Sequence, residues 1–171
     1  MPRYAAFLRG VMPTNASMEA LRRAFEAAGY GNVKTVLASG NVVFDSRATS
    51  LPALERKVEA AIEKGLGKHF MTIVRPVDGL RELLKRDPYK AHKVKADAKR
   101  IVTFLRKPPE GLALPIEQDG ARIVHLEGND LFTAYLPTPK GPVFMKLIEK
   151  AAGSKEQTTR TWQTLERIAA A

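Results

Sequence analysis

The feature that most constrains the fold is a segment that occurs twice. "TVLASGNVVFDS" occupies residues 35–46, and "IVHLEGNDLFTA" occupies residues 123–134. In each segment a Gly-Asn pair separates two runs of strand-forming residues, and both residue types tolerate the positive φ that tight turns require. We therefore expect two β-hairpins. At an offset of 88, the second hairpin places Val124, Gly128, Asn129 and Phe132 where the first has Val36, Gly40, Asn41 and Phe44.

The segments around the first hairpin predict a β-α-β-β-α-β unit. An apolar strand opens it at residues 4–9, and a helix with an apolar stripe follows, capped by Asn15 or Ser17. After the hairpin, residues 51–66 form a second helix with Pro52 in its first turn, and residues 71–75 form a strand. This order is that of a ferredoxin-like split βαβ fold for residues 1–76.

The second half repeats this order with one element reduced. Residues 100–106 match the opening strand, and both contain Phe-Leu-Arg. A helix is expected between Pro142 and Gly153, then a strand that ends at Arg160. The stretch "PPEGLALPIEQDG" is too rich in proline for a full helix. The sequence thus predicts an α+β fold of two ferredoxin-like units in tandem, the second with a degraded first helix. Chance likeness of two hairpins is the alternative.

The predicted organisation has three parts. Residues 1–76 form the first unit, residues 77–99 a short helix and a basic connector, and residues 100–171 the second unit with a C-terminal helix, "WQTLERIAA". The short helix ends at Asp87-Pro88, because a residue before proline avoids the helical region. The units are either separate domains or one compact body.

Composition excludes several classes of protein. The longest apolar runs are a few residues, far below the ~20 needed to cross a bilayer, so we expect no membrane association and a cytoplasmic location. The chain has no cysteine, which excludes disulfides and thiolate chemistry. The three histidines lie far apart, so neither a metal nor a cofactor is expected. No Walker loop, GxGxxG or GxSxG motif is present, which argues against an enzyme.

Positive charge is the strongest compositional signal. The formal net charge is +10, and residues 77–107 hold ten basic and four acidic residues. A basic segment favours polyanionic partners, with nucleic acid first, although a merely soluble linker is the alternative. The candidate nucleic-acid-binding residues are Lys85, Arg86, Lys90, Lys93, Lys95, Lys99 and Arg100.

Three stretches resemble a known family. They are "YAAFLRG" followed by Asn15 and Met18, "VLASGNVVF" after the first helix, and the closing "TTRTWQTL". In order and spacing they resemble the bacterial domain-of-unknown-function 1697 family over nearly the whole chain. The resemblance implies an α+β fold of ferredoxin-like halves and implies no activity. The chain departs from the family pattern in "VMPTN", where a Gly-rich segment is usual, and at Thr161, where Asn is more common.

Six residues are candidates for binding a small anion. Arg9 ends the opening strand, and its forked guanidinium suits phosphate or carboxylate. The other candidates are Asn15, Ser39, Asn41, Arg160 and Trp162. Each also has a local explanation: Asn15 as a cap, Ser39 and Asn41 as turn residues, Arg9 as a surface charge, and Trp162 as a packing residue.

Three functions remain open from the sequence. The first is a non-catalytic anion-binding module, with nucleic acid as the leading ligand. The second is an enzyme that acts on a phosphorylated or carboxylated metabolite in a cleft between the halves, for which Asp45 with Glu127 or Asp130 could supply an acid and a base. The third is a structural protein whose sheet pairs with another copy. The sequence does not assign the oligomeric state.

Overall fold

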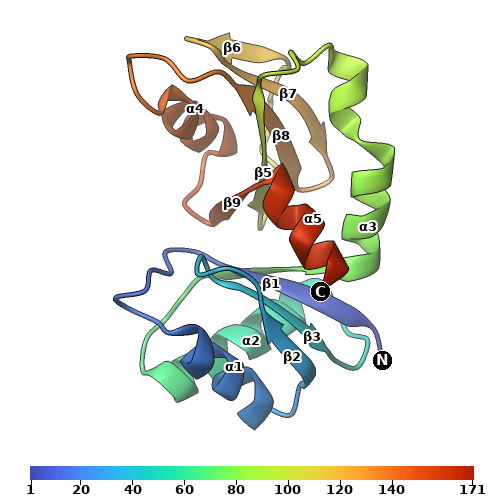
Figure 1. Ribbon diagram of the computed structural model, residues 1–171, viewed down its shortest axis with the longest axis vertical. Helices are drawn as coiled ribbons and strands as arrows, with labels where there is room; N and C mark the ends of the chain where they lie inside the picture. Colours follow the sequence, from blue (N-terminus) through green and yellow to red (C-terminus); the bar gives the residue numbers. More distant parts are fainter. The chain divides into compact units, whose positions relative to one another are not determined.

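A computed structural model describes residues 1–171, and the chain has a mixed α+β fold. It divides into two compact units (Figure 1). Unit 1 comprises Met1–Leu84 together with Thr164–Ala171, and unit 2 comprises Lys85–Gln163. Each unit contains one antiparallel sheet. No helix is both long and apolar enough to span a membrane.

Unit 1 is built on a four-stranded sheet. Its elements are β1 (Arg3–Leu8), α1 (Met18–Ala27), β2 (Gly31–Thr35), β3 (Asn41–Asp45), α2 (Leu51–Leu66) and β4 (Thr72–Pro76). The strand order is β2-β3-β1-β4, so β1 and β3 are central. Every residue of β1 after Arg3 is buried, as its apolar sequence predicts. Two helices cross the unit boundaries: α3 (Val77–Arg86) and α5 (Trp162–Ala170).

The helices α1 and α2 cover one face of the unit 1 sheet. Leu21 and Phe25 of α1 pack with Val58 and Ile62 of α2 against the strand residue Phe44. The Ser17 hydroxyl accepts a hydrogen bond from Ala20 N at 3.1 Å and so caps α1. This confirms one of the two predicted caps. The apolar stripe therefore explains which side of α1 is buried.

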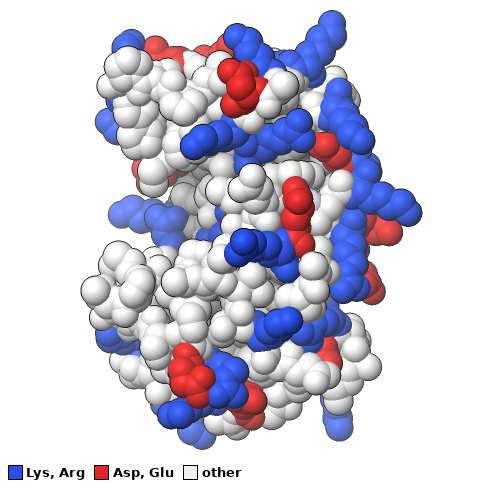
Figure 2. Space-filling view, viewed as in Figure 1, with Lys and Arg blue, Asp and Glu red and all other residues white.

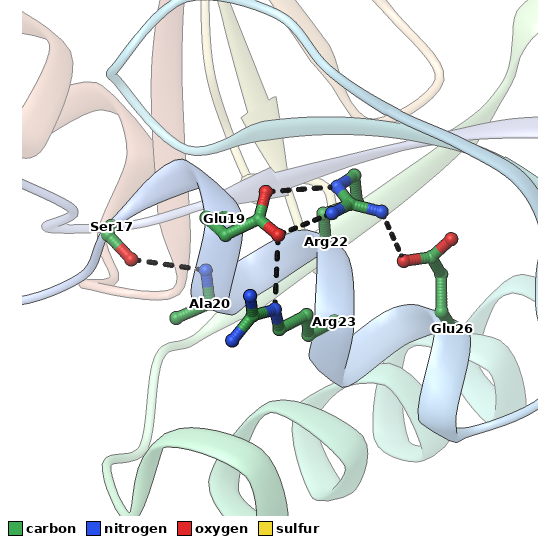
Figure 3. Close-up of polar contacts among 6 residues, drawn as sticks. All are labelled: Ser17, Glu19, Ala20, Arg22, Arg23 and Glu26. Atoms are coloured by element: carbon green, nitrogen blue, oxygen red, sulfur yellow. Dashed lines mark hydrogen bonds and ion pairs between the residues drawn. The ribbon is translucent and has the colours of Figure 1, made fainter.

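The outer side of α1 carries ion pairs that are closed within the helix (Figure 3). Glu19 accepts hydrogen bonds from both Arg22 and Arg23, and Arg22 also reaches Glu26 at 2.6 Å. These contacts join residues three and four apart, which are neighbours on a helix surface. The two arginines of α1 are therefore already balanced by acids of the same helix.

The last helix returns to unit 1. Arg3 Nε donates to the carbonyl of Ala171 at 3.3 Å, and Arg81 Nε donates to the carbonyl of Ala169 at 3.0 Å. Two cations thus bind carbonyls at the C-terminal end of α5, where helical carbonyls lack partners within the helix. The assignment of Thr164–Ala171 to unit 1 differs from the predicted organisation, in which residues 100–171 form a single unit. Hydrophobic periodicity identifies the helix, but not the sheet to which it returns.

The outer edge of β4 is closed by two buried glutamates of α2. Glu55 Oε2 accepts a hydrogen bond from Val74 N at 2.9 Å, and Glu59 Oε2 accepts one from Thr72 N at 3.0 Å. Four residues advance an α-helix by about 6 Å, and two residues advance a strand by roughly 6.8 Å, so the spacings match. Carboxylates thus satisfy edge N–H groups that would otherwise be free to pair with another strand.

Unit 2 contains a five-stranded sheet. Its strands are β5 (Lys99–Leu105), β6 (Ile116–Gln118), β7 (Ala121–Glu127), β8 (Asp130–Tyr135) and β9 (Gln157–Thr161), in the order β6-β7-β8-β5-β9. One face packs on α4 (Val143–Ala152) through Leu147 and Ile148. The proline-rich segment contains the short β6 and no helix, as predicted. Gly153 follows the last residue of α4, as predicted, and ends the helix in the left-handed conformation with φ +66°.

The segment predicted as a solvated connector is instead anchored to the unit 2 core by one buried residue. It contains the short 3-10 helix η1 (Pro88–His92), in which Tyr89 is only 1% exposed. The Tyr89 hydroxyl donates to Ile101 O at 2.5 Å, and its ring meets Phe132 and Trp162 edge-on. Burial raises the pKa of this hydroxyl, so it remains a donor. One aromatic residue in a basic stretch was too weak a pattern to predict this packing.

The two Gly-Asn pairs do not occupy equivalent positions. Gly128 and Asn129 form the turn between β7 and β8, as predicted, but Asn41 is the first residue of β3, and the loop comprises residues 36–40. Asn41 lies opposite Phe7, whereas Asp130 lies opposite Phe104. When Phe7 is matched to Phe104, Asn41 therefore corresponds to Asp130, which is one residue further along than the offset of 88 predicts. Because a shift of one residue exchanges the faces of a strand, Phe44 and Phe132 are not equivalent core residues.

The β4 edge gives a stability prediction. Glu55→Ala and Glu59→Ala each leave one buried N–H without its acceptor, so each should lower the free energy of unfolding by about 1–3 kcal/mol. Glu63→Ala is the matched control, because Glu63 is exposed on the same helix and should change it by less than about 0.5 kcal/mol. Urea unfolding measures all three. Equal losses of unfolding free energy in Glu63→Ala and Glu55→Ala would contradict a specific role of Glu55 at the edge of the sheet.

Candidate functional site

One end of the unit 1 sheet brings together four predicted ligand-binding residues. Arg9 follows β1 directly, and its N–H donates to Met71 O at 2.9 Å, which fixes the end of the strand beside β4. Asn15 Nδ2 donates to Gly10 O at 2.9 Å, and its Oδ1 accepts from Met12 N at 2.8 Å. Lys68 Nζ in turn donates to Asn15 O at 3.1 Å. Both functional groups of the Asn15 side chain thus order the loop after β1.

Asn41 and Ser39 lie at the same end of the sheet. The buried Asn41 amide donates to Val36 O at 2.9 Å and to the Ser39 hydroxyl at 3.0 Å. Gly40 O accepts from Leu8 N at 2.9 Å, which places the 36–40 loop beside the end of β1. A side chain on Gly40 would meet Val11 at 2.9 Å, and its φ of +85° also favours glycine. Asn41 therefore braces the loop from inside, rather than forming its turn.

Arg160 and Trp162 belong to unit 2. Arg160 is only 8% exposed, and its guanidinium donates to Thr158 Oγ1 at 2.6 Å and to Thr159 O at 2.9 Å. Burial lowers its pKa to about 10, which still leaves it charged at neutral pH. The half-buried Trp162 meets Tyr89 edge-on with ring centroids 5.2 Å apart. Because Arg9 lies in unit 1, an anion site shared by Arg9 and Arg160 stays a prediction.

Two of the three predicted acid and base residues, Asp45 and Glu127, are held in ion pairs within separate units. Asp45 accepts from Arg3 at 2.8 Å and from Asn32 at 2.6 Å. Glu127 of unit 2 accepts from Arg86 at 2.7 Å. The Asn32 hydrogen bond, followed by that of Arg3, lowers the pKa of Asp45. No group of three or more potential His, Asp or Glu metal ligands occurs in residues 1–171.

The seven basic residues of the segment 85–100 fall into two groups. Arg86 pairs with Glu127 at 2.7 Å, and Arg100 pairs with Asp87 at 3.3 Å while its guanidinium lies 5.5 Å from the Tyr89 ring centre. The other members are five exposed lysines: Lys85, Lys90, Lys93, Lys95 and Lys99. Figure 2 shows Lys and Arg side chains gathered along the side where α3 and the segment after it lie in Figure 1.

Two contacts fix the part of the segment that carries most of these lysines. Arg122 Nη1 donates to His92 O at 2.9 Å, which ties the end of η1 to β7. The His92 and His125 rings lie 5.3 Å apart, and His125 in turn packs on Phe132. Burial, with the nearby charges of His125 and Arg122, lowers the pKa of His92. Neither the role of Arg122 nor the histidine pair could be predicted, because no local pattern connects residues 92 and 122.

Comparisons with known proteins identify the family of the chain and a protein of similar fold. The chain belongs to the family described as protein of unknown function DUF1697, whose model matches residues 1–132. Among solved structures, the chain is similar to the conserved bacterial protein SP0830 from Streptococcus pneumoniae. That likeness has a TM-score of 0.74 at 19% identity and covers 99% of this chain and 97% of the other. It shows a shared fold. No curated protein matches the chain.

The Asp45 ion pair gives a pH prediction. Its folded-state pKa is lowered, so the ionised carboxylate stabilises unit 1 above the unfolded pKa, near 3.9, and this contribution is lost as pH falls through the folded pKa. The free energy of unfolding should therefore be larger for wild type than for Asp45→Asn at neutral pH. The difference between the two should become smaller as the pH falls. Urea titrations across this range measure it. Asp78 forms an exposed ion pair, so Asp78→Asn should unfold with nearly the same free energy as wild type at any pH. A difference between wild type and Asp45→Asn that stays constant with pH would contradict the prediction.

Proposed function

We propose that the protein is a non-catalytic binding module for the phosphate backbone of nucleic acids. The contact surface is a lysine platform, defined as Lys85, Lys90, Lys93 and Lys95. The observation that carries the proposal is a cluster of exposed lysines on a segment fixed to the core by Tyr89. Lys99 is left out of the platform because its side chain lines a separate pocket.

The fixed backbone supports this role. A charge on a loose linker must be ordered when it binds, and ordering side chains and backbone costs free energy. Here Tyr89 and the Arg122–His92 contact already hold η1 on the sheet. The lysine side chains remain mobile, but their attachment points are set before a ligand arrives.

The distribution of acids supports it as well. The arginines of α1 are balanced by Glu19 and Glu26, and those of the basic segment pair with Glu127 and Asp87. The platform lysines are exposed and contribute positive potential to the surface. Since lysine acts as a compact point charge, this surface suits phosphates without reading bases. We expect weak binding that does not depend on sequence.

Salt dependence tests the lysine platform. Each neutralised phosphate releases counter-ions, so the slope of log K against log[salt] should be about −0.9 per contact on duplex DNA and about −0.7 on single strands. Replacing Lys90, Lys93 and Lys95 together by Gln should flatten this slope by roughly two to three units. Fluorescence titration with labelled single- and double-stranded oligonucleotides at low salt measures it.

A second triple variant provides the control. Lys146, Lys150 and Lys155 are exposed in the same unit, and changing them to Gln alters the net charge equally. This variant should retain the wild-type slope if the platform is the contact surface. Equal flattening by both variants would indicate diffuse attraction to the whole unit, and no affinity for any oligonucleotide at low salt would end the proposal.

We also propose that the two units are tandem ferredoxin-like copies of one plan. The order β2-β3-β1-β4 in unit 1 corresponds to β7-β8-β5-β9 in unit 2, with β6 added at the edge. Leu8 and Leu105 follow equivalent phenylalanines, and their N–H groups donate to Gly40 O and Asn129 O at 2.9 and 2.8 Å. The shared Phe-Leu-Arg motif thus supports the duplication better than the Gly-Asn pairs do.

An experimental structure of the chain tests the duplication. Superposing β1, β3 and β4 on β5, β8 and β9 should bring Phe7 onto Phe104 and Asn41 onto Asp130, because the two ladders share this register. The opposite alignment, with Asn41 on Asn129 and the strand faces exchanged, would contradict the proposed equivalence.

A further inference from the structure

Unit 2 contains a pocket of about 270 Å³ beside the N-terminal end of α4. Lys99, Tyr135 and Ala121 come from three neighbouring strands and lie directly opposite one another in the ladder. Their side chains therefore point to the same face of the sheet. This is the face that α4 covers, since Ala121 and the α4 residue Leu147 share one apolar core.

The walls of the pocket are mostly apolar. Tyr135 and Phe144 stack with ring centres 4.0 Å apart and planes inclined by 16°. The loop 136–142 forms the opposite wall and is fastened to the β6–β7 turn. Leu136 N donates to Gly120 O at 3.0 Å, and Lys140 Nζ donates to Asp119 Oδ1 at 3.1 Å. The loop also passes so close that a Cβ on Gly120 would meet Thr138 at 3.2 Å.

Three polar features of the lining favour a negative group. Lys99 is exposed and lines the pocket, whereas the only acid in the lining, Asp119, already binds Lys140. The Thr138 hydroxyl is buried and has no hydrogen-bond partner, although buried polar groups are normally satisfied. Pro142 precedes α4 without a side-chain cap, and although Val143 N and Met145 N donate to Gly141 O and Pro142 O, the positive end of the helix dipole lies at the pocket.

We propose that this pocket binds a small organic acid with an apolar body. The body, a single ring or a short chain, packs against Tyr135 and Phe144, and the carboxylate meets the Lys99 ammonium. The Thr138 hydroxyl, which is buried in the unliganded pocket, reaches the carboxylate when its side chain rotates. The volume is slightly below the usual range of about 300–1,000 Å³ for ligand pockets, which limits the occupant to roughly the size of one ring. The proposal does not depend on the lysine platform, because Lys85, Lys90, Lys93 and Lys95 do not line the pocket.

The test is a ligand titration of the full chain, monitored by two-dimensional NMR of the backbone amides. Sodium benzoate should shift the amides of residues 136–144 saturably, with a Kd of about 1 mM, as expected for a fragment of this size. Acetate lacks the body and benzyl alcohol lacks the charge, so each should bind at least about tenfold more weakly. If acetate or inorganic phosphate shifts these amides as strongly as benzoate, or if benzoate does not shift them, the proposal is overturned.

Two variants locate the carboxylate. Lys99→Gln should weaken benzoate binding about tenfold, since it removes a charge-assisted hydrogen bond. Thr138→Val, which removes the hydroxyl at nearly constant shape, should weaken it severalfold and provides an independent test if Lys99→Gln perturbs the fold. Lys150→Gln, exposed in the last turn of α4, should have no effect. Wild-type affinity in both pocket variants would overturn the proposal, and Lys99→Gln should leave oligonucleotide binding nearly unchanged.

Discussion

The unit 1 sheet depends on satisfying the backbone N–H groups at its outer edge. A four-stranded sheet has two edges, and an edge with free donors invites pairing with another chain. Here the edge at β4 is closed by carboxylates from α2, one of the two helices that pack on the sheet. The position of α2 therefore sets both the packing of the sheet and its boundary. Burying two acids is tolerable because each receives a backbone donor, and Arg75 lies 4.0 Å from Glu55.

In unit 2 a single tyrosine has a comparable role. Tyr89 connects the segment after α3 to β5 through its hydroxyl and to Phe132 and Trp162 through its ring. Together with the Arg122–His92 contact, Tyr89 fixes a polar stretch of chain as a surface on which the lysines are displayed. Packing thus links the aromatic core of unit 2 to the electrostatic surface that we propose for nucleic acids. The two proposed ligand sites of the unit share no residue. The platform lies on α3, η1 and the segment after η1, whereas the pocket is lined by β5, β7, β8 and the loop 136–142.

Much of the secondary structure follows from local sequence, but its assembly does not. Helix α2 begins beside Pro52, α4 ends at Gly153, and α5 coincides with "WQTLERIAA", because caps, breakers and periodicity act within a few residues. The predicted register of the first hairpin is wrong, because Asn41 favours a turn by its residue type, whereas pairing with Phe7 of β1 places it in β3. The candidate residues near Arg9 share one end of a sheet, as the strand order predicts. The pocket near Lys99 was not predicted, because cross-strand pairing and a distant loop create it.

The return of α5 to unit 1 has a consequence for synthesis of the chain. Unit 2 is in effect an insertion, since Met1–Leu84 and Thr164–Ala171 flank it in sequence and fold together. During translation the carbonyls that Arg3 and Arg81 bind emerge only after the whole of unit 2. Unit 1 therefore cannot complete its contacts with α5 until the whole of unit 2 has been synthesised. The first segment made is thus among the last to be finished.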